Sequence, residues 1–376
     1  MEVDMDDAQR IAREILEIAD VAVNGERPWD IRVHNEDFFG RVLAGGSLAL
    51  GESYMDGWWD CEQLDELITR ILSKDLQQMV RPSLRVFLLW LKSVFLNTQR
   101  KSRAYNIAER HYDLGNDLYR LMLDKGMNYS CGYWKRAKNL DEAQEDKLEL
   151  ICRKIHLEKG MRVLDIGCGW GGFARHAAEL HGARVVGITV SREQAELARA
   201  RCRDLPVEIR LQDYRDLDER FDRIVSVGMI EHVGFKNYRR YMQVAAHCLA
   251  PDGLFLLHTI GANVSSRFND PWNDKYIFPD GMLPSLQQLT KAAEGLFKIE
   301  DVHSFGQYYD TTLLAWNRNF TAGWEQIKDR YGERFSRMWH YYLLSSAASF
   351  RSRTVQLWQI VLAPLKSSLS YESIRD

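Results

Sequence analysis

Five short apolar runs recur between residues 162 and 258, and the segments that separate them have the pattern of helices. The runs cover residues 162–166, 184–188, 207–211, 222–227 and 254–258. A helix is expected after the first run as far as His181, and another is expected to begin near Arg192. Strands that alternate with helices predict a parallel sheet with helices on both faces. The fold class is therefore predicted to be α/β, with a doubly wound, mostly parallel sheet.

Two later runs, at residues 298–304 and 355–362, are expected to add edge strands to this sheet. The segment between them is rich in aromatic residues and is interpreted as a helical insertion. With these two runs the sheet is expected to have seven strands.

The first 98 residues are expected to form a smaller, mainly helical domain. Apolar residues at positions 64, 67, 68, 71 and 72 recur at helical spacing, with charges on the other face. The glycine-containing stretches at residues 45–51 and 57–59 are interpreted as turns, the second with an aromatic plug. We expect a basic linker at residues 99–108 and a second, larger domain over residues 109–376.

The composition is that of a globular protein, because 45% of the 376 residues are hydrophobic and 27% are charged. The 50 Lys and Arg residues nearly balance the 53 Asp and Glu residues, which excludes a protein that coats nucleic acid with its whole surface. Six cysteines lie far apart without a C-x-x-C pair, so neither a disulfide framework nor a metal site is expected. The acidic start of the chain is unlike a secretory signal, and a cytoplasmic location is expected.

The net charge of −3 conceals one basic segment. Residues 76–108 contain six Lys and Arg residues and no Asp or Glu, so the rest of the chain carries a net charge of −9. Within this segment, residues 84–96 are rich in large apolar side chains. A basic, apolar helix can bind an anionic membrane surface, with about 1 kcal/mol for each charge near it. Peripheral association with the inner face of a membrane is therefore expected, and a buried helix followed by a solvated linker is the alternative.

A glycine-rich loop follows the first strand, in the string Asp165-Ile-Gly-Cys-Gly-Trp-Gly-Gly172. Glycines at such a position let the backbone turn tightly and approach a ligand at a helix N-terminus. Gly167, Gly169 and Gly172 also match the dinucleotide pattern G-x-G-x-x-G, and a plain tight turn is a further alternative. Asp165, however, precedes the glycines, and Thr189 rather than an acid ends the second strand. These features favour the cationic S-adenosylmethionine over a dinucleotide.

Further distinctive motifs lie on both sides of the glycine loop. They are Gly51-Glu-Ser-Tyr-Met-Asp-Gly-Trp-Trp59, Glu109-Arg-His-Tyr-Asp-Leu-Gly-Asn116, Tyr129-Ser-Cys-Gly-Tyr-Trp134, Gly228-Met-Ile-Glu-His-Val-Gly234, Lys275-Tyr-Ile-Phe-Pro279 and Tyr309-Asp-Thr-Thr-Leu313. In these motifs and their order the chain resembles the cyclopropane-fatty-acyl-phospholipid synthases and, more distantly, the mycolic acid cyclopropane synthases. One departure is Ile230, where the family usually has Phe. The resemblance implies a class I methyltransferase sheet.

The resemblance also implies a reaction. It implies that the methyl group of S-adenosylmethionine is added to the cis double bond of an unsaturated phospholipid acyl chain, and that removal of a proton then closes a cyclopropane ring. In the family the base is a bound bicarbonate ion. The positions that match its binding residues are Cys131, Glu231, His258, Tyr309 and the backbone of Ile260. Taken singly, these residue types also suit a small buried thiol, a helix cap, a core histidine and aromatic packing.

The cofactor contacts come from several segments. Asp165 can orient the loop or bond to the amino group, and Gly167 and Gly169 are expected to approach the methionine part. Thr189 and Gln194 are expected near the ribose hydroxyls. The remaining contacts are expected from Tyr129 and Ser130, which close over the cofactor, and from Asp213 and Tyr214, which clamp the adenine. Asp213 suits a simple turn equally well.

The expected partner is unsaturated phospholipid in a membrane, with no nucleic acid, and the family resemblance suggests a homodimer. Three other functions stay open. They are an S-adenosylmethionine-dependent N- or O-methyltransferase of a small molecule, a nucleotide-binding dehydrogenase, and a non-catalytic membrane-binding module.

Overall fold

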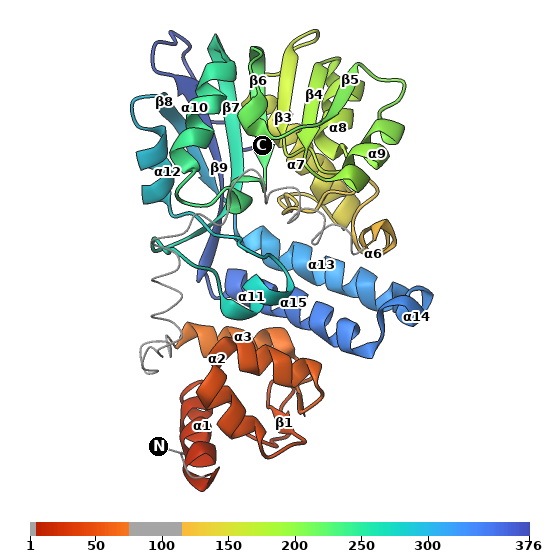
Figure 1. Ribbon diagram of the computed structural model, residues 1–376, viewed down its shortest axis with the longest axis vertical. Coiled ribbons are helices and arrows are strands. Elements are labelled where there is room, and N and C mark those ends of the chain that lie inside the picture. Colours follow the sequence, from red (N-terminus) through yellow and green to blue (C-terminus); the bar gives the residue numbers. More distant parts are fainter. Residues whose placement is uncertain (1–4, 75–114) are drawn as a thin grey trace.

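The computed structural model describes residues 5–74 and 115–376, with side chains from residue 9 onward. In Figure 1 the N-terminal helices lie at one end of the molecule and the large sheet lies at the other. Two features expected from the sequence, the apolar stretch 84–96 and the basic linker 99–108, lie outside the described residues. The domain boundaries that depend on them stay predictions.

Seven strands form the large sheet, in the order β5-β4-β3-β6-β7-β9-β8. The strands are β3 (Arg162–Ile166), β4 (Arg184–Thr189), β5 (Val207–Leu211), β6 (Phe221–Val227), β7 (Leu249–Ala262), β8 (Phe297–Ser304) and β9 (Val355–Pro364). β3 to β7 are parallel, whereas β9 is antiparallel to both of its neighbours. The chain builds outward from β3 to β5 and then returns to β6 beside β3. Such a switch of direction leaves a crevice at the carboxyl ends of the strands, where ligands bind in sheets of this kind.

Helices cover both faces of the sheet (Figure 1). One group is α7 (Leu140–Lys154), α8 (Gly172–His181) and α9 (Arg192–Arg201), and the other is α10 (Tyr238–Cys248) and α12 (Leu286–Ala293). Successive residues of a strand point to opposite faces, so Val163 is buried against the first group and Leu164 against the second. The doubly wound α/β sheet predicted from the alternating pattern is confirmed.

The strand positions follow the apolar runs, but the order of the sheet does not follow from them. β3 and β5 have the predicted bounds. β7 is longer than predicted because its second half pairs with β9. The expectation that both late strands lie at the edge is wrong for β9, which lies between β7 and β8. Every residue of β9 from 357 to 363 is buried, as befits a strand with neighbours on both sides.

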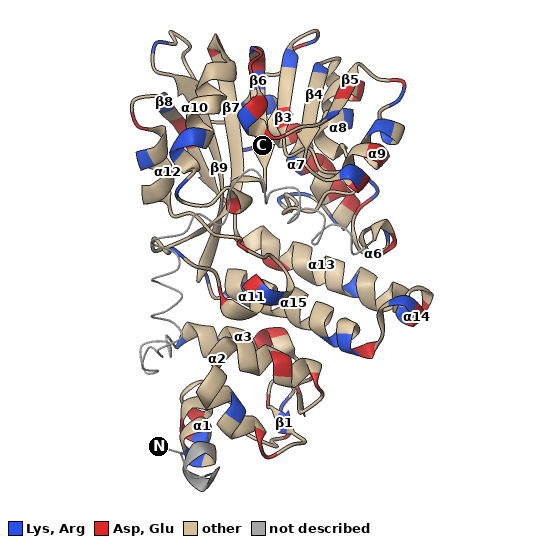
Figure 2. Ribbon diagram, viewed as in Figure 1, with Lys and Arg blue, Asp and Glu red and all other residues tan. Residues whose placement is uncertain are grey.

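The chain leaves the sheet between β8 and β9 to form the predicted helical insertion. Its helices are α13 (Gln307–Gly323), α14 (Lys328–Tyr331) and α15 (Glu333–Arg351). In Figure 1, α13 and α15 lie between the sheet and the N-terminal helices. Most residues of α13 are neither acidic nor basic (Figure 2). Trp316 and Trp339 of the insertion are fully buried in an apolar cluster that also contains Trp59 and Leu67. One core therefore joins the N-terminal part to the rest.

The described N-terminal part is mainly helical. Its elements are α1 (Met5–Ile18), β1 (Arg32–Val33), α2 (Phe38–Met55), β2 (Trp59–Asp60) and α3 (Leu64–Ser73); between it and the sheet lie the short helices α6 (Asn116–Met122) and α11 (Pro271–Tyr276). The predicted turn at residues 45–51 is wrong, because these residues belong to α2 and only Gly46 leaves the helical conformation. Gly51 has a different purpose. A Cβ there would lie 2.4 Å from the indole of Trp272 on α11.

The close approach of α2 to Trp272 predicts an effect of substitution at Gly51. Gly51→Ala should destabilise the protein by about 1–3 kcal/mol, because the methyl group overpacks the contact with a fully buried indole. Gly40→Ala on the same helix meets no atom within 4 Å and should be neutral or slightly stabilising. Denaturant unfolding of both variants measures the difference, and equal midpoints would contradict the packing role of Gly51.

Candidate functional site

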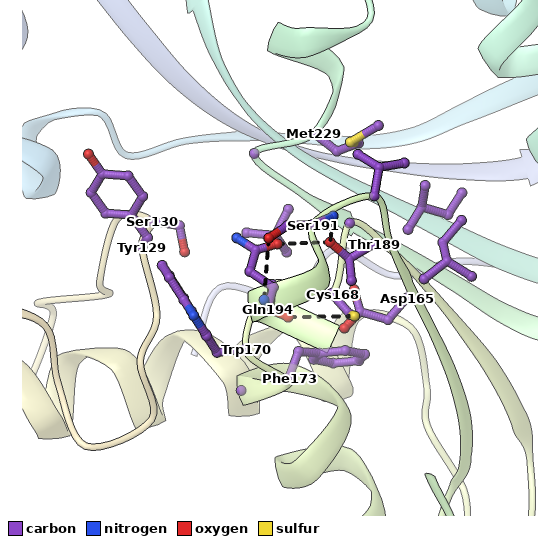
Figure 3. Close-up of a pocket in the computed structure, with 18 of the residues that line it drawn as sticks. Tyr129, Ser130, Asp165, Cys168, Trp170, Phe173, Thr189, Ser191, Gln194 and Met229 are labelled. Carbon is purple, nitrogen blue, oxygen red and sulfur yellow. Dashed lines mark hydrogen bonds between the residues drawn. The ribbon is translucent and has the colours of Figure 1, made fainter. Parts of the chain in front are cut away.

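A cavity of about 170 Å³ lies at the carboxyl ends of β3, β4 and β6. It is lined by all nine residues predicted to contact the cofactor, which are Tyr129, Ser130, Asp165, Gly167, Gly169, Thr189, Gln194, Asp213 and Tyr214. In Figure 3, Tyr129 and Ser130 lie across the cavity from Thr189 and Gln194. The structure therefore brings these residues to one place, and their individual contacts with a cofactor stay a prediction.

The glycine loop has backbone angles that glycine adopts most easily. The angle φ is +85° at Gly167, +53° at Gly169 and +80° at Gly171. A Cβ at Gly167 would also lie 3.1 Å from the side chain of Met229. Helix α8 begins directly after the loop, at Gly172. The unpaired N–H groups of its first turn can therefore face a negatively charged group of a ligand in the cavity.

Hydrogen bonds order the polar residues at the end of β4. Thr189 Oγ1 donates to Gln194 Oε1 at 2.8 Å, and Ser191 Oγ accepts from the backbone N of Gln194, which caps α9 (Figure 3). The next strand ends similarly, where Asp213 Oδ1 accepts from the backbone N of Arg215 at 2.9 Å. The turn alternative and the cofactor prediction for Asp213 are thus compatible, because the turn holds the carboxylate at the cavity wall.

Asp165 lines the cavity, and its carboxyl group is buried. It is 2% exposed, and its Oδ2 has no hydrogen-bond partner among the described residues. Burial raises the pKa of Asp165 to about 7, and the positive charge of Lys147 opposes this shift. Lys147 is also buried, so that its pKa is lowered to about 8, and its Nζ donates to Ser130 Oγ at 3.0 Å. Two groups of opposite charge thus line one small cavity.

Lys147 is a cavity residue that the sequence interpretation missed. The buried face of α7 includes residues 140, 143, 144, 147, 148 and 151, the spacing of an amphipathic helix. A lysine on that apolar face could have been recognised from the sequence as a candidate site residue, because lysine is rarely buried without a partner. Gln144 on the same face donates from Nε2 to the backbone O of Ser130 at 2.7 Å. Helix α7 therefore positions the segment that covers the cavity.

Glu231 lies in a single helical turn directly after β6. Its Oε1 accepts from the backbone N of Ile260 at 2.8 Å, and its Oε2 is buried without a hydrogen-bond partner among the described residues. Burial raises the pKa of Glu231 to about 7. The alternative that Glu231 caps the next helix is wrong, since Asn237 is the N-cap residue of α10. The backbone N–H of Ile260 thus donates to Glu231, and the expected contact of the Ile260 backbone with an anion stays a prediction.

His258 lies two residues before Ile260 on β7, and it is 1% exposed. Its Nδ1 is 3.2 Å from Nε2 of Gln359 on β9. Its Nε2 is buried without a hydrogen-bond partner in the described part of the chain. Burial holds the pKa of His258 well below its ordinary value, and the charges of Lys147 and Lys154 act in the same direction. The imidazole is therefore neutral.

Cys131 and Tyr309 are linked through helix α13. The Cys131 thiol is fully buried, donates to the backbone O of Gly132 at 3.2 Å and accepts from Thr312 Oγ1 at 3.9 Å. Burial raises the pKa of the thiol, so it is protonated and can donate to an anion but does not act as a thiolate nucleophile. Tyr309 lies three residues before Thr312, and its ring stacks on Phe350 with centroids 4.5 Å apart.

These five residues adjoin the cavity without lining it. Cys131 follows the cavity residue Ser130 in the chain, and Glu231 precedes the cavity residue His232. Gly228, which lines the cavity, donates from its backbone N to the backbone O of His258 at 2.9 Å. Three of the predicted anion-binding residues, Cys131, Glu231 and His258, are therefore directly connected to residues that line the cavity.

One group of potential metal ligands, which the sequence analysis did not foresee, lies between α7 and α8. The ligand atoms of Cys152, His176 and His181 lie within 4.8 Å of one another. Glu149 Oε2 is 2.9 Å from His181 Nε2 and 3.5 Å from His176 Nε2, so the two histidines share one carboxylate. None of these residues lines the cavity.

Comparison with known proteins identifies the family to which this arrangement belongs. Residues 99–360 match the family model of mycolic acid cyclopropane synthetase. Over 358 residues the chain is 52% identical to the cyclopropane-fatty-acyl-phospholipid synthase of Escherichia coli strain K12. The aligned region covers 95% of this chain and 94% of that relative. The chain belongs to the cyclopropane fatty acid synthase family. It is thus an S-adenosylmethionine-dependent methyltransferase that acts on lipid.

Solved structures confirm the fold expected of a cyclopropane fatty acid synthase. Mycolic acid cyclopropane synthase CmaA1, complexed with SAH and CTAB, aligns with a TM-score of 0.64 and 32% identity over 69% of this chain and 97% of that one. Coclaurine N-methyltransferase aligns with a TM-score of 0.70 over 84% of this chain and 98% of that one, but at 21% identity it shows the fold alone. The predicted class I methyltransferase sheet is confirmed. No described helix is long and apolar enough to cross a bilayer.

The raised pKa of Glu231 predicts how its substitution changes stability with pH. A carboxyl group with a pKa near 4.3 in the unfolded chain and about 7 in the folded protein lowers stability as pH rises between these values, by about 4 kcal/mol above pH 7. Glu231→Gln removes the ionisation and should therefore become more stable than the unaltered protein as pH rises from about 5 to about 8. Chemical unfolding across this range measures the effect, with Glu196→Gln on the exposed face of α9 as a control. If the difference in stability between Glu231→Gln and the unaltered protein did not change with pH, the raised pKa of Glu231 would be contradicted.

Proposed function

We propose that this protein forms cyclopropane rings in membrane phospholipids. In this proposal the methyl group of S-adenosylmethionine is transferred to the cis double bond of an unsaturated acyl chain, and a proton is then lost as the ring closes. The 52% identity to a cyclopropane-fatty-acyl-phospholipid synthase over 95% of the chain supports this substrate class. The observation that carries the chemistry is the pair of buried, unpartnered polar atoms on Glu231 and His258.

The two atoms are suited to bicarbonate. Buried polar atoms in proteins normally have hydrogen-bond partners, so Glu231 Oε2 and His258 Nε2 indicate that a small polar species completes this site. A neutral imidazole N–H donates and a carboxylate accepts, and bicarbonate offers both an acceptor oxygen and a hydroxyl donor. When bound, bicarbonate supplies a base for the methyl proton. We propose that it is held by Cys131, Glu231, His258 and Tyr309, together with the backbone of Ile260.

Glu231 has a further part in this proposal because its pKa is raised to about 7. Near neutral pH its carboxyl group can exist in either protonation state. It can therefore accept a hydrogen bond from a protonated anion without a full charge repulsion, and it can share a proton with that anion. A carboxyl group with an ordinary pKa would repel the ion instead.

The surrounding aromatic side chains suit a reaction with a cationic intermediate on the acyl chain. Tyr309 stacks on Phe350, and Trp316 packs against both Tyr309 and Tyr129 with centroids 5.9 and 5.1 Å apart. Ring faces attract cations and are poor nucleophiles. The side chains also exclude water, which would otherwise trap the cation. The aromatic insertion thus has a proposed chemical purpose beside its packing role.

We further propose that the protein works at a membrane surface and as a homodimer. The six positive charges within residues 76–108, with no acid among them, support electrostatic binding to anionic lipid. Two subunits would present two such segments to one bilayer, which strengthens weak surface contacts.

One assay tests the reaction and the membrane contact together. Protein, methyl-labelled S-adenosylmethionine and unsaturated phospholipid vesicles should yield cyclopropane acyl chains by mass spectrometry, at a rate that rises with added bicarbonate. Glu231→Gln should slow turnover by roughly a hundredfold or more.

The same assay tests the membrane contact. Joint replacement of Arg100, Lys101 and Arg103 by Glu should reduce turnover on anionic vesicles and leave cofactor binding unchanged. Branched or still unsaturated methylated lipids, or methylation of small amines instead, would contradict the proposal.

The role of Asp165 predicts a pH dependence of cofactor binding. S-adenosylhomocysteine carries a positive amino group, which should bind the ionised carboxylate more tightly than the protonated form. Because the pKa of Asp165 is about 7, affinity should rise about tenfold per pH unit below that value and level off above it. Calorimetry measures this profile.

Two variants separate Asp165 from the other buried acid. Asp165→Asn should bind more weakly and without the pH dependence, whereas Glu231→Gln should retain it. Loss of the dependence in Glu231→Gln but not in Asp165→Asn would assign it to the wrong carboxyl group.

A further inference from the structure

A row of buried polar side chains extends from His258 across the antiparallel side of the sheet. Gln359 of β9 lies opposite His258 of β7 and opposite His303 of β8 in the strand register. Lys154 at the end of α7 meets this row, with its Nζ 2.8 Å from Gln359 Oε1 and 2.8 Å from His303 Nδ1. Gln359 and Lys154 are 0% exposed. None of these residues lines the cofactor cavity.

The hydrogen bonds in this row have a determined direction. A protonated lysine can only donate, so the atom of Gln359 that faces the ammonium group of Lys154 is the amide oxygen. The amide nitrogen of Gln359 then faces His258 Nδ1 at 3.2 Å, and it can only donate. His258 Nδ1 must therefore accept. In a neutral imidazole the single proton then lies on Nε2.

The environment of Lys154 maintains its donor role. Asp301 Oδ2 lies 4.0 Å from Lys154 Nζ, and Asp301 is itself bound by Arg375 and by Ser373 Oγ. Burial lowers the pKa of Lys154 to about 7, which the carboxylate of Asp301 opposes. His303 is neutral because burial lowers its pKa to about 3, so its Nδ1 is free to accept from Lys154.

We propose that Lys154 and Gln359 are positioning residues that hold His258 in the Nε2–H tautomer, so that its buried Nε2 presents a proton to an anion. The use of that proton for bicarbonate rests on the proposed function, whereas the tautomer follows from the hydrogen bonds alone. In the opposite tautomer Nε2 would present a lone pair, which repels an anion. We call the hydrogen-bonded series Lys154, Gln359 and His258 the relay. The relay thus favours an anion at Nε2 of His258 before any ligand binds.

The substitution Gln359→Glu tests the relay with almost no change in shape. A carboxylate accepts from Lys154 and also from His258, so the proton of His258 should move to Nδ1 and leave Nε2 as an acceptor. We expect the bicarbonate concentration for half-maximal turnover to rise roughly tenfold to a hundredfold, the effect of one lost hydrogen bond to a charged group. Affinity for S-adenosylhomocysteine should stay the same. Gln356→Glu, the same change on the same strand at a partly exposed position, should alter neither property.

Nitrogen NMR of histidine-labelled protein reads the tautomer directly, with the signals of His258 assigned by their loss in His258→Gln. The unaltered protein should show a protonated Nε2 and an unprotonated Nδ1, and Gln359→Glu should show the reverse. A protonated Nδ1 in the unaltered protein would overturn the proposal without any variant. An unchanged tautomer in Gln359→Glu would overturn the role of Gln359. Turnover that does not depend on bicarbonate, with the expected tautomers in both proteins, would refute the proposed anion and leave the relay supported.

Discussion

The structure depends on the burial of ionisable groups at the carboxyl edge of a parallel sheet. Asp165 of β3, Glu231 after β6 and His258 of β7 belong to adjacent strands, and each is at least nine-tenths buried. An isolated charge in such a place would cost several kcal/mol, so burial favours the uncharged form of each group. Burial raises the pKa of both acids to about 7 and lowers that of His258. An ion bound there would meet two carboxyl groups whose protonation it can change, which ordinary surface residues would not offer.

The same constraint explains why so much aromatic material surrounds the site. Buried polar groups keep shifted pKa values only where water is excluded, and the insertion α13–α15 supplies that exclusion. Its Trp316 packs against Tyr129 and Tyr309, while Tyr341 of α15 packs against Tyr54 of α2. The insertion therefore couples the polar site to the apolar core of the whole molecule. A substrate with a long acyl chain is consistent with such surroundings, since its chain and the site require the same absence of water.

Patterns that are local in the sequence predicted the local structure well. The apolar runs located β3 and β5 residue for residue, and the glycine loop and the motif at Tyr129 lie at the cavity. Features that depend on distant partners were not predictable in this way. The glycines at residues 45–51 resemble a turn signal, yet Gly51 serves a contact with Trp272, 221 residues away in the sequence. Lys147 was overlooked because a charged residue within an apolar helical face is usually a minor exception, and its partner Ser130 lies on a separate segment.

The position of β9 shows how sheet order can decide chemistry. An apolar run specifies that a strand exists, but it does not specify which strands flank it, because backbone hydrogen bonds are the same for any neighbour. As an edge strand beyond β8, β9 would leave Gln359 far from His258. Between β7 and β8 it places Gln359 opposite His258 and His303, within reach of Lys154. The antiparallel insertion of one strand thus supplies the only described hydrogen bond to the ring of His258, and with it the direction in which that ring can donate.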